Sequence, residues 1–319
     1  MKMVCLDGYT LNPGDNPWDR VEALGDLTVY DRTPADQILE RAKGAEVLLT
    51  NKTPITAETM EQLPDLKFIT VLATGFNIVD VEAARARNIP VSNVPIYGTD
   101  TVAQYVFALL LDHCHKAAHH SARVKDGEWA RRGDFCFWDY TLTELAGLTM
   151  GIVGFGRIGR RTGELANAFG MKVIAADVYK GDAPDYANFE WKEIPDLFAE
   201  ADVVSLHCPQ TADNVGFVNK ALLSTMKPSA FLINTARGPL VNEQDLADAL
   251  NNDVIAGAAV DVVSKEPIEA SNPLMQAKNL LITPHMAWGT VAARTRLMGT
   301  TAENIEAFIN GKPINVVNE

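Results

Sequence analysis

Short apolar runs alternate with stretches of helical periodicity along almost the whole chain. The runs before residue 101 are KMVCLD, LTVYD, EVLLTN, FITVLATG and PVSNV, and those after residue 171 are KVIAAD, DVVSLH, FLINTA, VIAGAAVDV and LLITPH. Helical patterns, for example over residues 34–44 and 80–88, lie between them. Strands that alternate with helices form parallel sheets with right-handed crossovers. The chain is therefore predicted to form two doubly wound α/β units.

One strand-to-helix turn is rich in glycine. In LTMGIVGFGRIGRRTGELANAFGMKVIAADVY the turn residues are Gly154, Gly156 and Gly159, and Asp177 ends the next strand. The first glycine allows a tight turn, the second lets the backbone approach a pyrophosphate, and the third lets the helix pack close to the strand. Asp177 follows Gly159 by 18 residues, close to the ~20 expected for a carboxylate that binds ribose hydroxyls. The turn predicts a dinucleotide site.

The dinucleotide is predicted to be NAD(H). Asp177 would repel a 2′-phosphate, and the two residues after it supply no arginine to receive one. Lys180 is the nearest positive charge that could act against this preference. Arg157 and Ile158, at the start of the helix, are also expected to face the cofactor.

Three residues with complementary chemistry follow apolar runs. Arg237 comes directly after LINTA, His285 directly after LLITP, and Glu266 shortly after IAGAAVDV. Ligand sites form outside the carboxyl ends of parallel strands, so we expect the three side chains to converge. A guanidinium grips a carboxylate with two hydrogen bonds, and an imidazole beside a carboxylate exchanges a proton in a fixed tautomer. The set predicts a site for a carboxylate-bearing substrate that gains or loses a proton.

A longer amphipathic segment joins the two alternating regions. TVAQYVFALLLDHCHKAAHHSARV (101–124) predicts one long helix whose first half is apolar around most of its circumference. A helix of this kind is buried on several sides, which a domain boundary together with a subunit interface would explain. We therefore expect a homodimer formed through helix 101–124 and segment 125–145.

Three histidines lie on the polar second half of that helix. His115 and His119 have the i, i+4 spacing of a metal pair, but no carboxylate or cysteine stands at a suitable offset. We interpret His115, His119 and His120 as a solvated helix end and expect no metal site.

A final helix is predicted to begin at Thr290, whose hydroxyl suits an N-cap, and to end at GKP (311–313). Since it starts just beyond LLITPH, we expect it to pack back on the first unit. Residues 1–100 and 286–319 would then form a discontinuous substrate-binding domain. Residues 101–285 would form the NAD-binding domain, with the active site in the cleft between the two.

Composition argues against several other functions. The 319 residues are 47% hydrophobic and 22% charged, as in globular proteins, and the length suits two domains. The formal net charge of −13 argues against a nucleic-acid or anionic-membrane partner, and no apolar stretch approaches the ~18 residues of a membrane helix. Cys5, Cys114, Cys136 and Cys208 show no CxxC spacing, which favours reduced thiols in the cytoplasm.

Taken together, these features resemble the D-isomer specific 2-hydroxyacid dehydrogenase family, in which a central GxGxxG is followed by Arg, Glu and His at strand ends. The resemblance covers essentially the whole chain and implies a flavodoxin-like substrate domain and a Rossmann NAD-binding domain. Its motifs are ATGFNIVD (73–80), NVPIYGTDTVAQYVFALLL (93–111), HCPQT (207–211), NTARG (234–238), AVDVVSKEP (259–267) and TPHMAW (283–288).

The resemblance also implies roles for single residues. His285 would protonate the carbonyl oxygen of a keto acid as NADH delivers a hydride, and Glu266 would hold His285 in its protonated form. Arg237 would bind the substrate carboxylate and carbonyl, and the backbone amides of Thr74 and Gly75 would bind the other carboxylate oxygen. Besides Arg237 and His285, the implied cofactor contacts are His207, Cys208, Pro209, Thr235, Ala236 and, near the nicotinamide carboxamide, Asp261.

Two segments are similar to the glycerate dehydrogenase, or hydroxypyruvate reductase, branch of the family. They are FCFWDYTLTELAG (135–147) and HMAWGTVAARTRL (285–297). The branch implies reduction of hydroxypyruvate to D-glycerate by a homodimer, in which Trp138 either reaches the partner's substrate pocket or packs in the interface. Lys52, in LLTNKTP, either lines the pocket or is a solvated loop residue.

The same sequence features are compatible with other substrates and with one non-enzymatic function. Glyoxylate, pyruvate or phosphohydroxypyruvate would use the same catalytic groups. Formate-oxidising relatives carry Gln in place of Glu266, and phosphoglycerate-type relatives often carry a regulatory extension, whereas 34 residues follow His285 here. NADH-sensing corepressors share the fold and can keep the same Arg, Glu and His, but this chain shows no recruitment tail.

Overall fold

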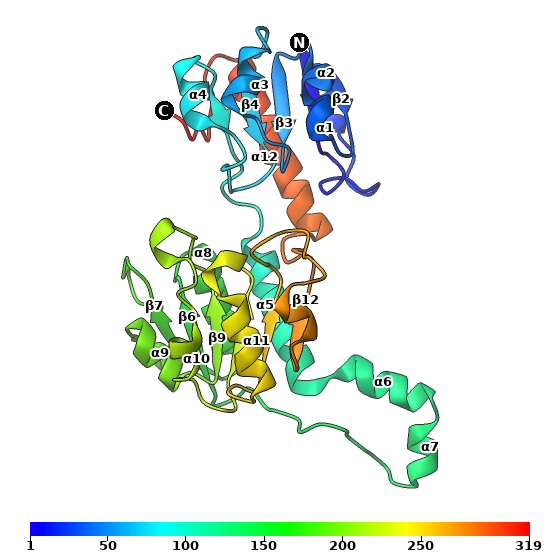
Figure 1. Cartoon of the computed structure of the whole chain (residues 1–319), viewed down its shortest axis with the longest axis vertical. Helices are drawn as coiled ribbons and strands as arrows, with labels where there is room; N and C mark the ends of the chain where they lie inside the picture. Colours follow the sequence, from blue (N-terminus) through cyan, green and yellow to red (C-terminus); the bar gives the residue numbers. More distant parts are fainter. The chain divides into compact units, whose positions relative to one another are not determined.

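The computed structural model describes all 319 residues, which form two compact units. The first unit comprises Met1–Gly98 and Trp288–Glu319, and the second comprises Thr99–Ala287. Each unit contains one sheet of parallel strands flanked by helices (Figure 1). The predicted fold class, two doubly wound parallel-sheet α/β units, is confirmed.

The sheet of the first unit has the strand order β2-β1-β3-β4-β5, which is the flavodoxin-like order. Strands β3 and β4 are buried along their whole length, as expected for parallel strands that are covered on both faces. The strands are β1 Lys2–Cys5, β2 Asp26–Val29, β3 Val47–Thr50, β4 Phe68–Val71 and β5 Val91–Ser92. The helices before the final one are α1 Asp19–Glu22, η1 Ala35–Gln37, α2 Ile38–Ala42, α3 Ala57–Glu61 and α4 Val81–Ala86.

The final helix, α12 Val291–Ile309, belongs to this first unit. Thr290 caps its first turn through its side chain, and Gly311 follows its end with a φ of 70°, both as predicted. Phe308 stacks on Phe68 of β4 with ring centroids 4.5 Å apart. The helix therefore covers one face of the five-stranded sheet.

The sheet of the second unit has the order β12-β11-β10-β9-β6-β7-β8. This is a Rossmann order with one added strand, and its direction of winding reverses between β6 and β9. The strands are β6 Thr149–Val153, β7 Lys172–Ala176, β8 Phe189–Trp191, β9 Val203–Leu206, β10 Phe231–Asn234, β11 Gly257–Val260 and β12 Leu280–Ile282. The short edge strand β8 was not predicted, because none of its three residues is fully buried and its sequence carries no apolar run.

The helices of the second unit include one correction to the sequence prediction. They are α5 Thr99–His115, α6 Ala117–Lys125, α7 Glu128–Arg132, α8 Arg157–Ala168, α9 Ile194–Glu200, η2 Ala212–Asn214, α10 Lys220–Leu223, η3 Gly238–Leu240, α11 Glu243–Asn251 and η4 Pro273–Gln276. The prediction of a single helix over 101–124 is wrong. The segment forms two helices, α5 and α6, which are separated at Lys116, a residue with a left-handed φ of 43°. The break falls where burial ends, because α5 packs on the sheet and α6 buries no residue. None of the helices is both long and apolar enough to cross a membrane.

Residues 116–142, which contain α6 and α7, form an arm that is held together by its own polar contacts (Figure 1). Asp139 accepts hydrogen bonds from His119 Nε2 at 2.9 Å and Arg132 Nη2 at 3.0 Å. The pKa of Asp139 is held below its usual range by these contacts and by that with Arg123, and the hydrogen bond with His119 has the largest effect. His120 accepts from the Asp139 backbone N–H through Nε2 at 3.1 Å. His119 and His120 are partly exposed and also bind the returning loop, a contact that was not predicted, whereas His115 is exposed.

Candidate active site

The glycine turn after β6 is shaped by close backbone contacts. Gly154 has a φ of 91°, and a Cβ there would lie 2.4 Å from the Cys208 nitrogen. A Cβ on Gly159 would lie 2.1 Å from the Gly154 carbonyl oxygen. These two positions therefore admit no side chain, as the sequence predicted for a tight turn and a closely packed helix.

The start of α8 offers backbone N–H groups to an anion. The N-cap residue, Gly156, supplies no side-chain cap, and a Cβ at this position would meet nothing within 4 Å. The first N–H groups of a helix have no partners within the helix, and the helix dipole favours a negative charge there. Arg157 and Ile158 form this first turn. The turn fits the pyrophosphate of a dinucleotide.

Asp177 follows β7 and lies beside the glycine turn. Its carboxylate accepts from the backbone N–H of Phe155 at 2.5 Å and of Tyr179 at 3.1 Å. The next cation, Lys180, is paired with Glu193 at 2.8 Å. This end of the sheet therefore presents a fixed carboxylate, which suits ribose hydroxyls and disfavours a 2′-phosphate.

The segment after β9 packs against the same turn. His207 donates its backbone N–H to Val153 O at 2.7 Å, and its ring is hydrogen-bonded to Ser205 Oγ at 2.9 Å. Burial lowers the pKa of His207 to about 3, so the ring is uncharged near pH 7. Burial raises the pKa of Cys208 to about 11, which keeps it a thiol and argues against a nucleophilic role. Pro209, which follows, is exposed.

His285 and Glu266 are brought into direct contact. His285 Nδ1 lies 2.6 Å from Glu266 Oε2, and Glu266 Oε1 accepts from the Val263 N–H at 3.3 Å. His285 has a left-handed φ of 53°, and its backbone N–H donates to the Asp261 carbonyl at 2.7 Å. Because Nδ1 is engaged by the carboxylate, the nitrogen that can exchange a proton with a ligand is Nε2.

Asp261 holds the segment that carries His285. It is only 1% exposed, and its Oδ1 accepts from the Thr283 hydroxyl at 2.6 Å and the Met286 N–H at 2.9 Å. Its Oδ2 accepts from the Ala287 N–H at 2.8 Å. Sequence reasoning missed this role, although an aspartate directly after the buried run GAAV is itself a signal of a satisfied carboxylate. A contact with the nicotinamide carboxamide stays a prediction for this residue.

Arg237 follows β10, the strand next to β11 in the sheet. The Asn234 side chain shapes the turn, because it accepts from the Ala236 N–H at 3.0 Å and donates to the Arg237 carbonyl at 2.9 Å. The Arg237 guanidinium is exposed and donates to the Ala236 carbonyl at 2.7 Å. Thr235 is buried, and its hydroxyl has no partner in the protein. The guanidinium is thus available to an anionic ligand at the same edge of the sheet as His285.

The remaining predicted site residues lie in the first unit. Lys52 donates its backbone N–H to Asp7 Oδ2 at 2.5 Å, and its side chain is exposed. Thr74 Oγ1 donates to the Val94 carbonyl at 2.8 Å, and Gly75 is partly exposed. Contact of these three residues with the substrate stays a prediction.

The fold and these contacts define an NAD-dependent oxidoreductase, and comparison with known proteins agrees. The model of the D-isomer specific 2-hydroxyacid dehydrogenase NAD-binding domain matches residues 107–287. The hydroxypyruvate reductase of Blautia hydrogenotrophica is 48% identical over 100% of both chains. The glycerate dehydrogenase of Methylorubrum extorquens is 40% identical over 88% of each.

A solved structure gives the same result for the fold. An acyclic imino acid reductase in complex with NADPH and a D-amino acid is 32% identical, with a TM-score of 0.84 over 99% of this chain and 100% of that one. The chain belongs to the D-isomer specific 2-hydroxyacid dehydrogenase family, in the branch of hydroxypyruvate reductases and glycerate dehydrogenases. The predicted enzyme class and the predicted cofactor, NAD(H), are confirmed.

Proposed function

We propose that the protein reduces hydroxypyruvate to D-glycerate with NADH, and catalyses the reverse reaction. The observation that carries the proposal is the 2.6 Å contact between His285 and Glu266 at the sheet edge that also carries Arg237. The names of the Blautia and Methylorubrum relatives support the choice of substrate. Glyoxylate, pyruvate and phosphohydroxypyruvate are the alternative substrates.

The catalytic roles follow from the chemistry of the three side chains. Arg237 binds the substrate carboxylate and keto oxygen and stabilises the negative charge that develops on that oxygen. His285 donates the Nε2 proton to the same oxygen, and Glu266 stabilises the imidazolium before transfer. When bound at the glycine turn, NADH would supply the hydride that reduces the carbonyl carbon. In the oxidation direction His285 takes the proton back.

The other predicted residues bind and orient the two ligands. Residues 99–287 form the NAD-binding domain, and residues 1–98 with 288–319 form the substrate-binding domain. The substrate carboxylate is met by the backbone amides of Thr74 and Gly75, with Lys52 near the pocket. The cofactor contacts are Gly154, Gly156, Arg157, Ile158, Gly159, Asp177, His207, Cys208, Pro209, Thr235, Ala236, Arg237, Asp261 and His285.

The test is a panel of keto acids under one set of conditions. The value of kcat/KM for NADH oxidation is measured with hydroxypyruvate, glyoxylate, pyruvate and phosphohydroxypyruvate. We expect hydroxypyruvate to lead, because a single hydroxyl or methylene shifts preference by about 1–3 kcal/mol. A clear lead for another keto acid overturns the substrate and keeps the mechanism. Tight NADH binding without any turnover overturns the reductase proposal.

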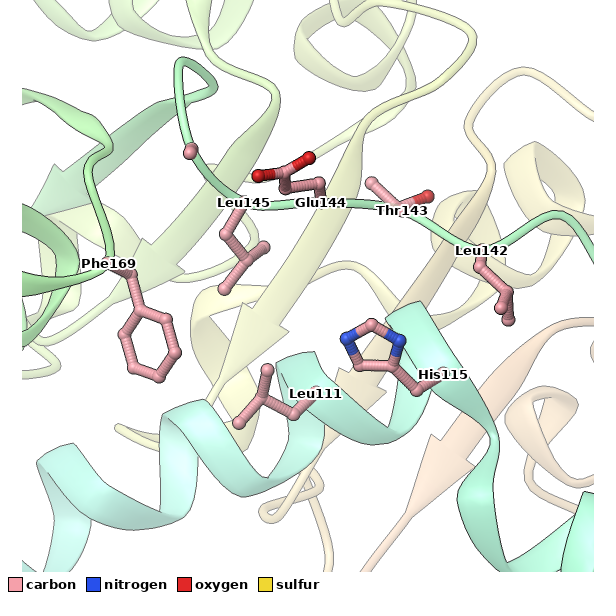
Figure 2. Close-up of a pocket in the computed structure, with 8 residues that line it drawn as sticks. Leu111, His115, Leu142, Thr143, Glu144, Leu145 and Phe169 are labelled. Atoms are coloured by element: carbon pink, nitrogen blue, oxygen red, sulfur yellow. The ribbon is translucent and has the colours of Figure 1, made fainter.

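We propose that the active form is a cytoplasmic homodimer built through residues 101–124, which lie in α5 and α6, and segment 125–145. The arm exposes large apolar side chains: 89% of Phe135 and 59% of Trp138 are accessible. Where residues 142–146 cross the end of α5, a groove of about 410 Å³ is lined by apolar side chains that include Leu111 and Phe169 (Figure 2). Figure 2 shows His115 pointing into this groove and the Glu144 carboxylate directed away from α5. Exposed large apolar side chains are typical of subunit interfaces.

The oligomeric state can be measured by sedimentation equilibrium. We expect twice the chain mass of 34.7 kDa, and a shift toward the monomer when Phe135 and Trp138 are both changed to Ser. Val215→Ser, at an exposed apolar residue outside the arm, is the matched control. If the arm variant lowers activity in proportion to monomer content, Trp138 or its neighbours act across the interface.

A further inference from the structure

The Glu243 side chain is hydrogen-bonded to both ends of the loop that carries Glu266. This loop, residues 264–272, lies between β11 and η4. Glu243, the first residue of α11, accepts from the Ser264 backbone N–H through Oε1 at 2.6 Å. Its Oε2 accepts from Asn272 Nδ2 at 2.9 Å. A single carboxylate therefore joins residues that are eight positions apart in the loop.

The second of these contacts requires an acceptor at position 243. Asn272 Oδ1 already accepts from the Leu274 N–H at 3.0 Å, where it caps η4. The orientation of the Asn272 amide is thereby fixed, and only Nδ2 is presented to Glu243. A glutamine at 243 could still accept from Ser264 but would turn an N–H group toward Asn272.

The beginning of the same loop is also packed against the segment that carries Arg237. A Cβ on Gly238 would lie 1.9 Å from the Val263 carbonyl carbon and 2.5 Å from the Ser264 nitrogen. The chain then continues through η3 into α11, where the Glu243 carboxylate accepts a hydrogen bond from the same Ser264 N–H. The Val263–Ser264 peptide is thus held from two sides by one short stretch of chain.

That peptide lies next to the group that orients Glu266. The Val263 N–H donates to Glu266 Oε1, and Glu266 Oε2 binds His285 Nδ1. We propose that Glu243 is a positioning residue, which holds loop 264–272 so that the Glu266 carboxylate meets His285. The inference rests on the proposed reductase function, and it assigns to Glu243 no contact with substrate or cofactor.

The first test compares the kinetics of variants at position 243 with hydroxypyruvate. Glu243→Ala is expected to lower kcat about tenfold, because small displacements of supporting groups cost this much or more, with KM for NADH unchanged. Glu243→Gln keeps one of the two contacts and is expected to fall between the wild type and Glu243→Ala. Gln244→Ala is the matched control, since Gln244 bonds only to Asp248 within α11 at 2.9 Å. A kcat of Glu243→Ala equal to that of the wild type would overturn the proposal.

A double-mutant cycle separates positioning from a general loss of structure. If Glu243 acts through Glu266, Glu243→Ala lowers kcat by less than about twofold in a Glu266→Gln background. An equal loss in both backgrounds overturns the proposal. Should Glu243→Ala fail to fold by thermal melting, Glu243→Gln is carried through the same cycle.

A spectroscopic readout makes the test independent of turnover. The Nδ1 proton of His285 in its 2.6 Å contact is expected as a downfield ¹H resonance that His285→Ala removes. This resonance should persist in Gln244→Ala and broaden or vanish in Glu243→Ala. An unchanged resonance in Glu243→Ala overturns the positioning role, even if no keto acid is turned over. Absence of turnover in the wild type, with the resonance changed as expected, overturns only the proposed substrate reaction.

Discussion

The two sheets share parallel strands and buried apolar runs, yet they use the ends of those strands in different ways. In the five-stranded sheet, Asp7 follows β1 and accepts from the backbone N–H groups of Asn51, Lys52 and Thr53 at 2.8, 2.5 and 2.7 Å. In the seven-stranded sheet, the turn after β6 is glycine-rich, and the first turn of α8 has no side-chain cap. The same architecture thus gives a turn closed by a carboxylate of the protein in one unit and a candidate anion site in the other.

The difference lies in what satisfies the backbone N–H groups. Successive N–H groups at a turn form a site for negative charge, and Asp7 supplies that charge from within the protein. At α8 the N-cap residue, Gly156, has no side chain to occupy this position, and Gly154 and Gly159 admit no Cβ. The two turns therefore differ at the helix start: no side chain of the protein caps the first turn of α8, whereas Asp7 binds the N–H groups of residues 51–53.

The largest expected effect concerns the acid at the edge of the seven-stranded sheet. His285→Ala should lower kcat by a factor of ~10² or more, because general acid catalysis is lost, while NADH still binds. Steady-state kinetics together with an NADH fluorescence titration check both parts. Turnover close to that of the wild type would remove His285 from its proposed role.

The next effect concerns the glycine turn. Gly154→Ala should raise the Kd for NADH at least about tenfold, because its φ of 91° is strained for alanine and the added Cβ meets Cys208. Gly147→Ala is a matched control, since Gly147 also has a positive φ, 84°, but has nothing within 4 Å of a Cβ. It should cost about 1 kcal/mol of stability and leave the Kd unchanged. Equal Kd values for the two variants would contradict the account of the turn.

A smaller effect is expected at the end of β7. Asp177→Ala should weaken NADH binding about tenfold, since a charged hydrogen bond contributes ~1.5–3 kcal/mol, and should narrow the preference for NADH over NADPH. The ratio of kcat/KM values for the two cofactors measures this. An unchanged ratio would mean that Asp177 does not bind the ribose.

The smallest effect on function is expected in the five-stranded sheet. Asp7→Asn should lower the free energy of unfolding by about 1–3 kcal/mol, because an amide nitrogen would face buried or half-buried N–H donors. The Kd of NADH should not change. Denaturant unfolding measures the first quantity and an NADH titration the second. A weakened NADH affinity would contradict the purely structural role of the Asp7 turn.

The strands and the principal site residues could be predicted from the sequence because their signals are local. Buried parallel strands are continuous apolar runs, and Arg237, Glu266 and His285 follow such runs closely. The break at Lys116 could not be predicted in this way, since helical periodicity continues through it while the surface that α5 packs on ends.

The supporting contacts of the site were also beyond sequence reasoning. Asp261 and Glu243 act through hydrogen bonds to backbone groups more than twenty residues away. Such contacts depend on how the loops lie in space and leave no periodic pattern in the chain. Asp261 has one local signal, its place directly after the buried run GAAV, but the hydrogen-bond partners of both acids are known only from the structure.

The continuity of residues 99–287 has a consequence for how the enzyme can change. The chain crosses between the two units only twice, at Gly98–Thr99 and at Ala287–Trp288, and the three proposed catalytic side chains lie between these points. The unit that contains His285, Arg237 and the glycine turn is therefore one continuous segment inserted into the sequence of the other unit. Substitutions in the first unit, to which the proposed substrate contacts Lys52, Thr74 and Gly75 belong, would then alter substrate preference without changing the three proposed catalytic side chains.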